Sequence, residues 1–255
     1  SMYTMAKGFY ANSNQYFIRY IAQRFGYFNT LQSIAGASEA SGFPINYLMT
    51  MKKGKQLCGK ILTPIMAAGL IMNLFINKNT PLWVIIIAIF LYNFGFSGPG
   101  FTATNIQPDV TDVDEMITGR RREGVISTFN TLIKKTINGL MSAFTGFILN
   151  GFGLRTGAEN ANALEQTAKG IFGLRLTYCI LPLIFVALVY VCVFTYKMTR
   201  EDHKMIIEAI KEKKETGRCT LTPEQIKRCE EIAGQSFGDM WIGRPSADTL
   251  FAELD

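Results

Sequence analysis

Four long stretches of this chain carry no charged residue. They cover residues 61–77, 79–108, 136–154 and 176–196. An α-helix needs about 20 mostly apolar residues to cross the hydrocarbon core of a bilayer. The stretches therefore predict four membrane-crossing helices, and the third extends back to Gly124 through Lys134 and Lys135.

A fifth stretch, residues 25–49, is long enough to cross a membrane but is more polar. Gly, Ser and Asn recur along it, and Glu39 is its one charged residue. This composition favours a helix that faces a cavity rather than lipid.

The charged residues are concentrated near the end of the chain. The last 59 of the 255 residues hold 22 of the 46 charged residues, whereas soluble domains are about a quarter charged throughout. The sequence thus predicts an all-α, polytopic transmembrane bundle over residues 1–198 and a cytoplasmic helical tail over residues 199–255. Two capping patterns mark helix starts in the tail, Thr199 with Asp202 and Thr222-Pro223 with Gln225.

Charge and cysteine content narrow the function classes. The formal net charge of +6 comes from bases spread over loops and mixed with acids in the tail, so nucleic acid is excluded as a partner. The same bases place the 51–60 loop, the segment after Pro108 and the tail on the cytoplasmic side of a plasma membrane. Five cysteines without a CxxC pair predict reduced thiols rather than a disulfide framework.

A charged segment lies between the second and third predicted crossings. Asp109, Asp112, Asp114 and Glu115 precede a run of three arginines at 120–122. One interpretation is a solvated loop with surface ion pairs of little energy. Another is the DxxD metal site of a magnesium-dependent membrane transferase, but such enzymes need a second acidic motif, and Glu39 is the only acid in the other predicted crossings. We therefore expect no enzyme. His203, in the tail, is expected to have no partner.

Two features lie inside the predicted crossings. Lys134 and Lys135 fall about 15 Å along the helix from Gly124, near the bilayer midplane, where charge is expensive and usually functional. A polar stripe runs through Lys135, which predicts a helix lining a water-filled or solute cavity. Its members are Ser127, Thr131, Lys135, Asn138, Ser142 and Thr145. The run Asn93 to Gly100, with Gly98-Pro99-Gly100, predicts an interrupted helix of the kind found at transporter binding sites.

These motifs together resemble a known transporter family. The acidic segment from Asp109, the sequence Thr118 to Gly124, the mid-span lysine and the closing Asn150-Gly-Phe-Gly153 are similar to the glycoside-pentoside-hexuronide:cation symporters, the melibiose permease family of the major facilitator superfamily. The resemblance covers about residues 9–214 and implies helices seven to twelve, the carboxyl-terminal half of such a protein. It also implies that an amino-terminal six-helix half is missing from this chain.

The resemblance assigns roles to individual residues. Asp109, Asp112, Glu115 and Arg121 match charged positions implicated in a cytoplasmic gate. Lys135, Thr131 and Asn130 match polar positions on helix eleven, where the lysine links the cation and sugar sites.

At two points the resemblance assigns no function to this chain. Gly100 stands where melibiose permease has a sugar-facing Trp, so melibiose specificity is not inherited. The resemblance places the carboxylates of the cation site in the missing half, so it assigns no metal or cation ligand in this chain.

The resemblance implies a secondary active transporter that couples uptake of a sugar or glycoside to sodium or proton entry by alternating access. No cofactor is expected beyond the coupling cation. The alternatives are a major facilitator carrier of a non-sugar solute such as an organic anion or lysolipid, a non-transporting membrane partner, and the magnesium-dependent transferase.

Overall fold

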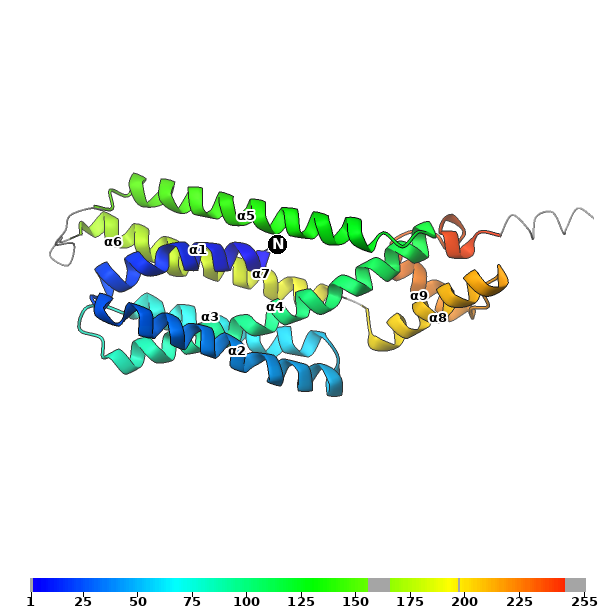
Figure 1. Ribbon diagram of the computed structural model, residues 1–255, viewed down its shortest axis with the longest axis horizontal. Helices are drawn as coiled ribbons and strands as arrows, with labels where there is room; N and C mark the ends of the chain where they lie inside the picture. The colour runs from blue at the N-terminus through cyan, green and yellow to red at the C-terminus, as the bar shows by residue number, and fades with distance from the viewer. Residues whose placement is uncertain (1, 156–165, 197, 246–255) are drawn as a thin grey trace, which may run out of the picture. The chain divides into compact units, whose positions relative to one another are not determined.

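The computed structural model describes residues 2–155, 166–196 and 198–245, and its regular elements there are helical (Figure 1). The all-α prediction is confirmed. The predicted tail reaches Asp255, so its last ten residues lie outside the described part. The α-helices are α1 (Met2–Tyr16), α2 (Phe28–Lys53), α3 (Gln56–Phe75), α4 (Leu82–Thr118), α5 (Glu123–Gly151), α6 (Ala168–Arg175), α7 (Leu181–Thr195), α8 (Arg200–Thr216) and α9 (Pro223–Ala233).

Among the residues that the structure describes, three helices are long and apolar enough to cross a membrane. They are α3, α4 and the continuous helix Ala168–Thr195, which joins α6 to α7 through a π-helical turn at Leu176–Ile180. The prediction of membrane-length apolar helices at these places is confirmed. With 26 and 29 residues, α2 and α5 have the length but not the apolar character, because polar residues recur on both. Crossing by α2 and α5 therefore remains a prediction.

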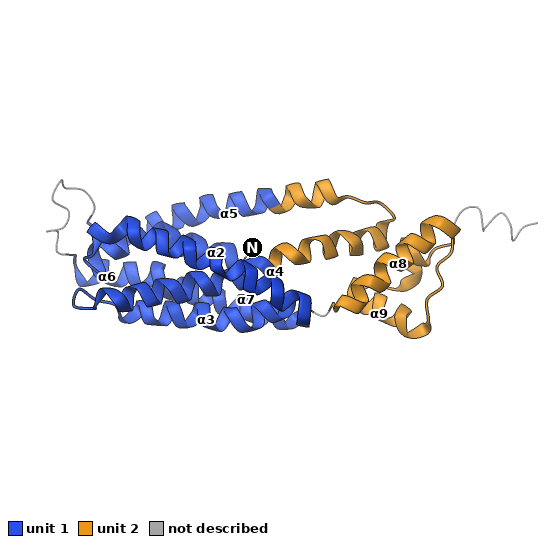
Figure 2. Ribbon diagram, turned by 60° about the horizontal axis from the view of Figure 1, so that its bottom comes forward, with its two compact units in different colours: residues 1–102, 131–195 blue, residues 103–130, 196–255 orange. Residues whose placement is uncertain are grey.

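The chain forms two compact units (Figure 2). Unit 1 comprises residues 1–102 and 131–195, and unit 2 comprises residues 103–130 and 196–255. The long helices α4 and α5 each contribute to both. A domain boundary at residue 198 stays a prediction.

An aromatic stack lies at the centre of unit 1. The Tyr10 ring on α1 lies 3.7 Å from that of Tyr92 on α4 and 4.5 Å from that of Tyr178, measured between centroids. The Phe17 ring stacks on that of Tyr178, with 3.9 Å between centroids. All four rings are buried. Large flat side chains thus join α1, α4 and the last transmembrane helix into one core.

Two buried polar side chains of unit 1, Tyr178 and Asn14, are hydrogen-bonded. The Tyr178 hydroxyl donates to the side-chain oxygen of Asn14 at 3.0 Å, and the Asn14 amide donates to Gln32 at 2.8 Å. Because a membrane offers no water to such groups, partners of this kind allow polar residues within a crossing.

The prediction of an interrupted helix at Asn93 to Gly100 is wrong. α4 is a single helix from Leu82 to Thr118. The glycines instead allow close packing against α3: a Cβ on Gly95 would lie 2.3 Å from the Met66 nitrogen, and one on Gly69 would lie 2.4 Å from the Tyr92 nitrogen. Small residues thus bring two backbones together, which is a common way to pack transmembrane helices.

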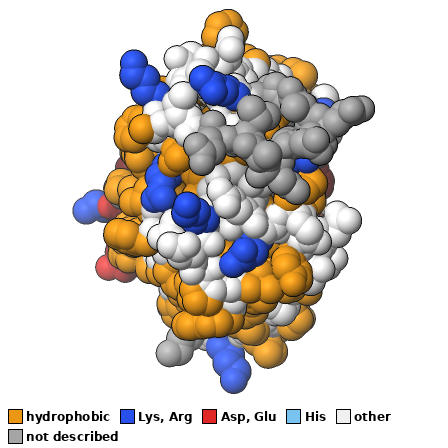
Figure 3. Space-filling model, turned by 90° about the vertical axis from the view of Figure 1, so that its left-hand side faces the viewer, with side chains coloured by type: hydrophobic (Ala, Val, Ile, Leu, Met, Phe, Trp, Pro, Cys, Tyr) orange, Lys and Arg blue, Asp and Glu red, His pale blue; other side chains and the backbone are white. Residues whose placement is uncertain are grey.

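The surface of unit 1 is apolar over much of its area. Large exposed side chains occur on α3, α5 and α7, among them Phe75, Phe147 and Val191. Figure 3 shows hydrophobic side chains over much of one face, with lysines and arginines standing apart from one another and few acids in view. Such a surface is expected of helices that contact lipid.

Unit 2 contains the two predicted tail helices. Thr199 and Asp202 form the predicted capping box at the start of α8, and Thr222 and Gln225 form the one at the start of α9. α9 ends before Gly234, which has a φ of +70°. Both helix starts are confirmed. The apolar core of this unit contains Met116 of α4, Ile206 and Ile210 of α8, and Cys229 of α9.

Candidate functional site

The acidic residues expected in a loop lie on the last turns of α4. Asp109, Asp112 and Glu115 are three residues apart, so they share one face of the helix. They are 3%, 7% and 1% exposed. The interpretation as a solvated loop is therefore wrong, because α4 continues ten residues beyond Pro108 and turns these carboxylates into the core of unit 2.

His203 of α8 lies between the first two carboxylates. Its Nε2 is 2.8 Å from Asp112 Oδ2 and 3.4 Å from Asp109 Oδ1. The Tyr196 hydroxyl donates to Asp109 Oδ2 at 2.8 Å, and burial together with this hydrogen bond raises the pKa of Tyr196. The expectation that His203 has no partner is wrong.

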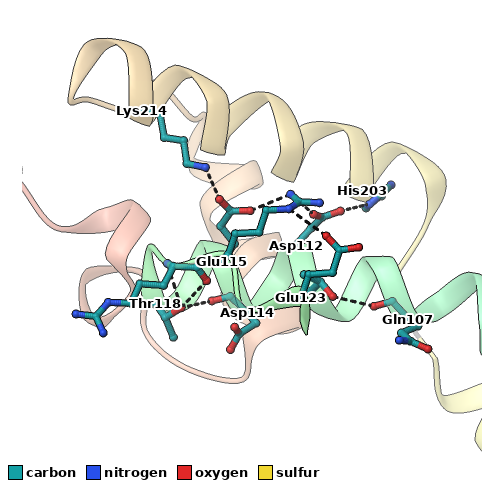
Figure 4. A network of polar contacts seen from close by, with 11 residues as sticks. Gln107, Asp112, Asp114, Glu115, Thr118, Glu123, His203 and Lys214 are labelled. Carbon is teal, nitrogen blue, oxygen red and sulfur yellow. Dashed lines mark hydrogen bonds and ion pairs between the residues drawn. The ribbon is translucent and has the colours of Figure 1, made fainter. Parts of the chain in front are cut away.

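Glu115 receives two cations from different segments. Arg121 Nη1 donates to Glu115 Oε2 at 3.2 Å, and Lys214 of α8 donates to Glu115 Oε1. The same Arg121 nitrogen lies 3.4 Å from Asp112 Oδ1, and the Arg121 Nε lies 3.4 Å from Glu123. Figure 4 shows these side chains converging between α4 and α8. We call Asp109, Asp112, Glu115, Arg121, His203 and Lys214 the charged cluster.

The register of α8 explains why its two basic residues reach the same face of α4. His203, Ile206, Ile210 and Lys214 follow at spacings of three, four and four residues, so they form one stripe on the helix. Ile206 and Ile210 are buried against Met116, and the two bases flank this apolar contact. The sequence contained this signal, but only the position of α4 shows what the stripe packs against.

The start of α8 is fixed by a second ion pair. Asp202 closes the capping box by accepting from the Thr199 nitrogen at 2.7 Å. The Arg228 guanidinium of α9 donates to both Asp202 oxygens, at 3.0 and 2.9 Å. Arg228 and Thr199 lower the pKa of Asp202 to about 2. Asp202 thus stays ionised and joins α8 to α9.

The connection from α4 to α5 packs on Trp241. Gly119 has a φ of +70°, and a Cβ there would lie 2.5 Å from the Trp241 ring. The Trp241 ring thus lies against Gly119, the residue that follows α4. Beside it, Arg122 pairs with Asp114 through two nitrogens.

The charged cluster is suited to reversible ion pairing. Its carboxylates are buried, whereas the Arg121 and Lys214 side chains are about half exposed, at 56% and 50%. Breaking such a pair leaves a buried charge unpaired, which is costly unless another cation replaces the first. Within the ranges that the structure describes, no group of three or more His, Cys, Asp or Glu residues is placed to hold a metal ion.

The three residues matched to a solute site lie in sequence on α5. Thr131 and Lys135 are exposed. Asn130 donates to the Gln107 side chain at 2.7 Å. The buried face of α5 is Ile137, Met141, Thr145 and Leu149, so of the predicted polar stripe Thr145 alone is buried.

A cavity of about 430 Å³ lies between α1 and α5 in unit 1. Ser142 of the predicted stripe lines it together with Thr145, about 10 Å along the helix from Lys135. Polar groups of α1 face them. The lining residues are Asn12, Tyr16, Ser142, Thr145, Gly146, Leu149, Asn150 and Leu154.

Comparison with known proteins identifies the family. No curated protein matches the chain. The family model described as MFS/sugar transport protein matches residues 1–200, which include all the predicted crossings and the acidic segment of α4. The chain therefore belongs to the MFS/sugar transport protein family and is a membrane protein of the major facilitator transporter type.

Proposed function

We propose that this protein is a secondary active transporter that couples uptake of a sugar or glycoside to sodium or proton entry by alternating access. The family match over residues 1–200 carries the proposal. A helix with charged and polar residues along an exposed face, α5, supports it, because such a helix is stable in a membrane where it lines an aqueous path.

The solute contacts are assigned to α5. The Lys135 ammonium and the Thr131 hydroxyl are exposed one turn apart, where they can donate to sugar hydroxyls. Asn130 is the third contact, and it would have to exchange its bond to Gln107 for one to the solute.

The charged cluster is assigned to a gate on the cytoplasmic side. Asp109, Asp112, Glu115 and Arg121 would exchange partners between this chain and an amino-terminal half as the path opens and closes. The present ion pairs of Asp112 with His203 and of Glu115 with Lys214 support this role. These carboxylates already pair with bases from another segment, α8. Basic residues of an amino-terminal half would bind at the same carboxylates in place of those of α8.

The location follows from the bases. Lys52 and Lys55 stand near the end of α2, and Arg120 to Arg122 follow α4. In the predicted order of crossings, both groups lie on the same side of the membrane as the tail. Because loops rich in Lys and Arg are cytoplasmic, this supports a plasma-membrane protein with a cytoplasmic tail. The ligands of the coupling cation would come mainly from an amino-terminal half.

A non-sugar solute is the second candidate. The exposed Lys135 favours it, because an ammonium pairs more strongly with a carboxylate or sulfate than with a hydroxyl. A non-transporting membrane partner would tolerate loss of Lys135. A magnesium-dependent transferase would need Asp109 and Asp112 to release Tyr196 and His203.

Uptake by proteoliposomes tests the proposal. The full-length protein would be given a panel of ¹⁴C-labelled mono- and disaccharides, with labelled organic acids and lysophospholipids in parallel, under imposed sodium or pH gradients. Accumulation of a sugar above the outside concentration supports the proposal. Accumulation of an organic acid or lysolipid alone would establish the second candidate, and no gradient-dependent accumulation would contradict both.

A further inference from the structure

The cavity between α1 and α5 begins beyond a close contact of these two helices. A Cβ on Gly8 of α1 would lie 2.8 Å from the Cβ of Met141 on α5. Asn12 and Tyr16 follow Gly8 by four and eight residues on one face of α1, and both line the cavity. Thr145 follows Met141 by four residues and lines it from α5. One face of each helix therefore forms the close contact and then a wall of the cavity.

The polar groups in this cavity are uncharged and can form hydrogen bonds. Asn12 and Asn150 carry amides, and Tyr16 and Ser142 carry hydroxyls, so each of the four can donate and accept. Thr145 is 2% exposed and donates to the backbone carbonyl one turn earlier at 2.6 Å, which leaves its oxygen as an acceptor. The lining residues that the structure describes include no charged side chain.

This lining favours an uncharged solute that is rich in hydroxyls. A carboxylate or sulfate in the cavity would lose its hydration without meeting a cation, whereas sugar hydroxyls can exchange bonds to water for bonds to amides and hydroxyls. The Tyr16 ring, with Leu149 and Leu154, adds apolar surface for the C–H groups of a sugar ring. The volume of about 430 Å³ lies within the range of about 300–1,000 Å³ that is usual for small-molecule sites.

A polar stripe on α5 connects the cavity to Lys135. Lys135, Asn138 and Ser142 follow at spacings of three and four residues, so they share a face, and Asn138 is exposed between the other two. Ser142, at the cavity, lies about 10 Å along the helix from Lys135. A solute that contacts both places must span about this length, which two linked sugar rings do and a single ring does not.

We propose that the cavity between α1 and α5 is a second solute subsite, which takes one sugar ring of a disaccharide or larger glycoside while Lys135 and Thr131 contact another ring. This inference rests on the proposed function and specifies the class of its solute. The solute contacts then come from two helices, with Asn12 on α1 facing Ser142 and Asn150 on α5, rather than from α5 alone.

Gly146 allows the cavity to be filled from α5. It lines the cavity, and a Cβ there would have nothing within 4 Å, so Gly146→Leu takes up the space of the ring without a clash at its Cβ. Gly151→Leu is the matched control. A Cβ on Gly151 also has nothing within 4 Å, but this residue points about 140° away from Gly146 around the helix and is not among those that line the cavity.

Asn12 allows a test from the opposite wall. Asn12→Ala removes an amide from the cavity without filling it, so it tests hydrogen bonding rather than space. Gln15→Ala is its control, because Gln15 is exposed on the same helix and is not among the lining residues.

Equilibrium dialysis of the purified full-length protein in nanodiscs measures binding. The probes are the ¹⁴C-labelled disaccharides of the uptake panel and the monosaccharides from which each is built. We expect Gly146→Leu to weaken disaccharide binding by about 10-fold or more and Asn12→Ala to weaken it by about 3- to 10-fold. Monosaccharide binding should stay within about twofold of wild type in both variants, and the two controls should bind every probe as wild type does.

The outcomes separate this inference from the proposed function. Disaccharide binding that is unchanged in both Gly146→Leu and Asn12→Ala would overturn the subsite and leave sugar transport intact. Equal weakening of mono- and disaccharide binding by Gly146→Leu would contradict the assignment of two rings. A wild-type protein that accumulates monosaccharides but binds no disaccharide would overturn this inference alone, whereas one that accumulates no sugar would overturn the proposed function as well.

Discussion

Lys135 and Lys134 are neighbours in sequence but point about 100° apart around α5. Lys135 is exposed in line with Thr131, whereas Lys134 is partly buried. Two chemically identical side chains at the same depth therefore differ mainly in direction. This makes them a matched pair for locating the solute path.

We expect Lys135→Ala to lower sugar uptake by about 10- to 100-fold, the value of one hydrogen bond from a charged donor. Lys134→Ala should retain most of the uptake. Initial rates in vesicles, normalised to the amount of protein in the membrane, measure the difference. Equal losses in both variants would argue against a solute path along this face.

Asp202 acts at a single helix start and has a clear pH dependence. Its ordinary pKa of 3.8 falls to about 2 in the folded protein. A depressed pKa means that the ionised group stabilises the fold above about pH 3.8 and that this contribution is lost as the pH falls toward 2.

Asp202→Ala should cost about 1–2 kcal/mol of unfolding free energy, because it removes the capping acceptor and the partner of Arg228. Asp202→Asn should cost less, since an amide oxygen can still accept from Thr199. Thermal unfolding at neutral pH and near pH 2 checks this, and the wild-type advantage over Asp202→Ala should shrink in acid. An advantage that is the same at both pH values would contradict the assignment.

Helix packing explains which elements could be predicted and which contacts could not. Charge-free runs located α3, α4 and the last transmembrane helix, because a bilayer imposes length and hydropathy on each helix separately. Capping patterns located the starts of α8 and α9, because a cap is an interaction among residues close in sequence. Whether Gly95 interrupts a helix or packs against one depends on α3, and the local sequence does not contain that information.

The α3–α4 contact gives a direct test. Gly95→Ala places a methyl group against the Met66 backbone and should lower the unfolding free energy by about 1–3 kcal/mol. Gly139→Ala on α5 is the control, because a Cβ there has nothing within 4 Å, and it should be neutral or stabilise by up to about 1 kcal/mol. Thermal midpoints in detergent would show the contrast. A stable Gly95→Ala protein would refute close packing at this site.

The charged cluster, too, could be predicted only in part from the sequence. Asp109, Asp112, Glu115 and Arg121 were found together because they are close in sequence. His203 and Lys214 were missed because about 90 to 100 residues separate them from their carboxylates. A basic stripe on an amphipathic helix can be read from the sequence, but the helix that it pairs with cannot.

Docking of α8 on α4 is tested by two lysines of the same helix. Lys214→Ala removes a partner of the buried Glu115 and should destabilise α8 by about 1–3 kcal/mol. Lys211 of α8 forms an exposed ion pair with Glu215 at 3.9 Å, so Lys211→Ala should change stability by less than about 0.5 kcal/mol. Hydrogen exchange of the α8 amides in the full chain measures both. Equal protection in the two variants would show that Glu115 does not hold α8.

The whole molecule combines an apolar helical body with ionised groups at two places. Unit 1 holds the ion pair of Lys7 with Glu39, and unit 2 holds the charged cluster. A transporter needs both kinds of feature, since a site must bind within the membrane and its access must be controlled at the surface. The family match explains why one chain contains both.

The most direct measurement is sugar accumulation by the full-length protein in proteoliposomes under a pH or sodium gradient. The account predicts that at least one labelled sugar or glycoside reaches an inside concentration above that outside, and that an ionophore collapsing the gradient abolishes the excess. Failure of every sugar and glycoside in the panel to accumulate, with the protein correctly inserted, would contradict the account.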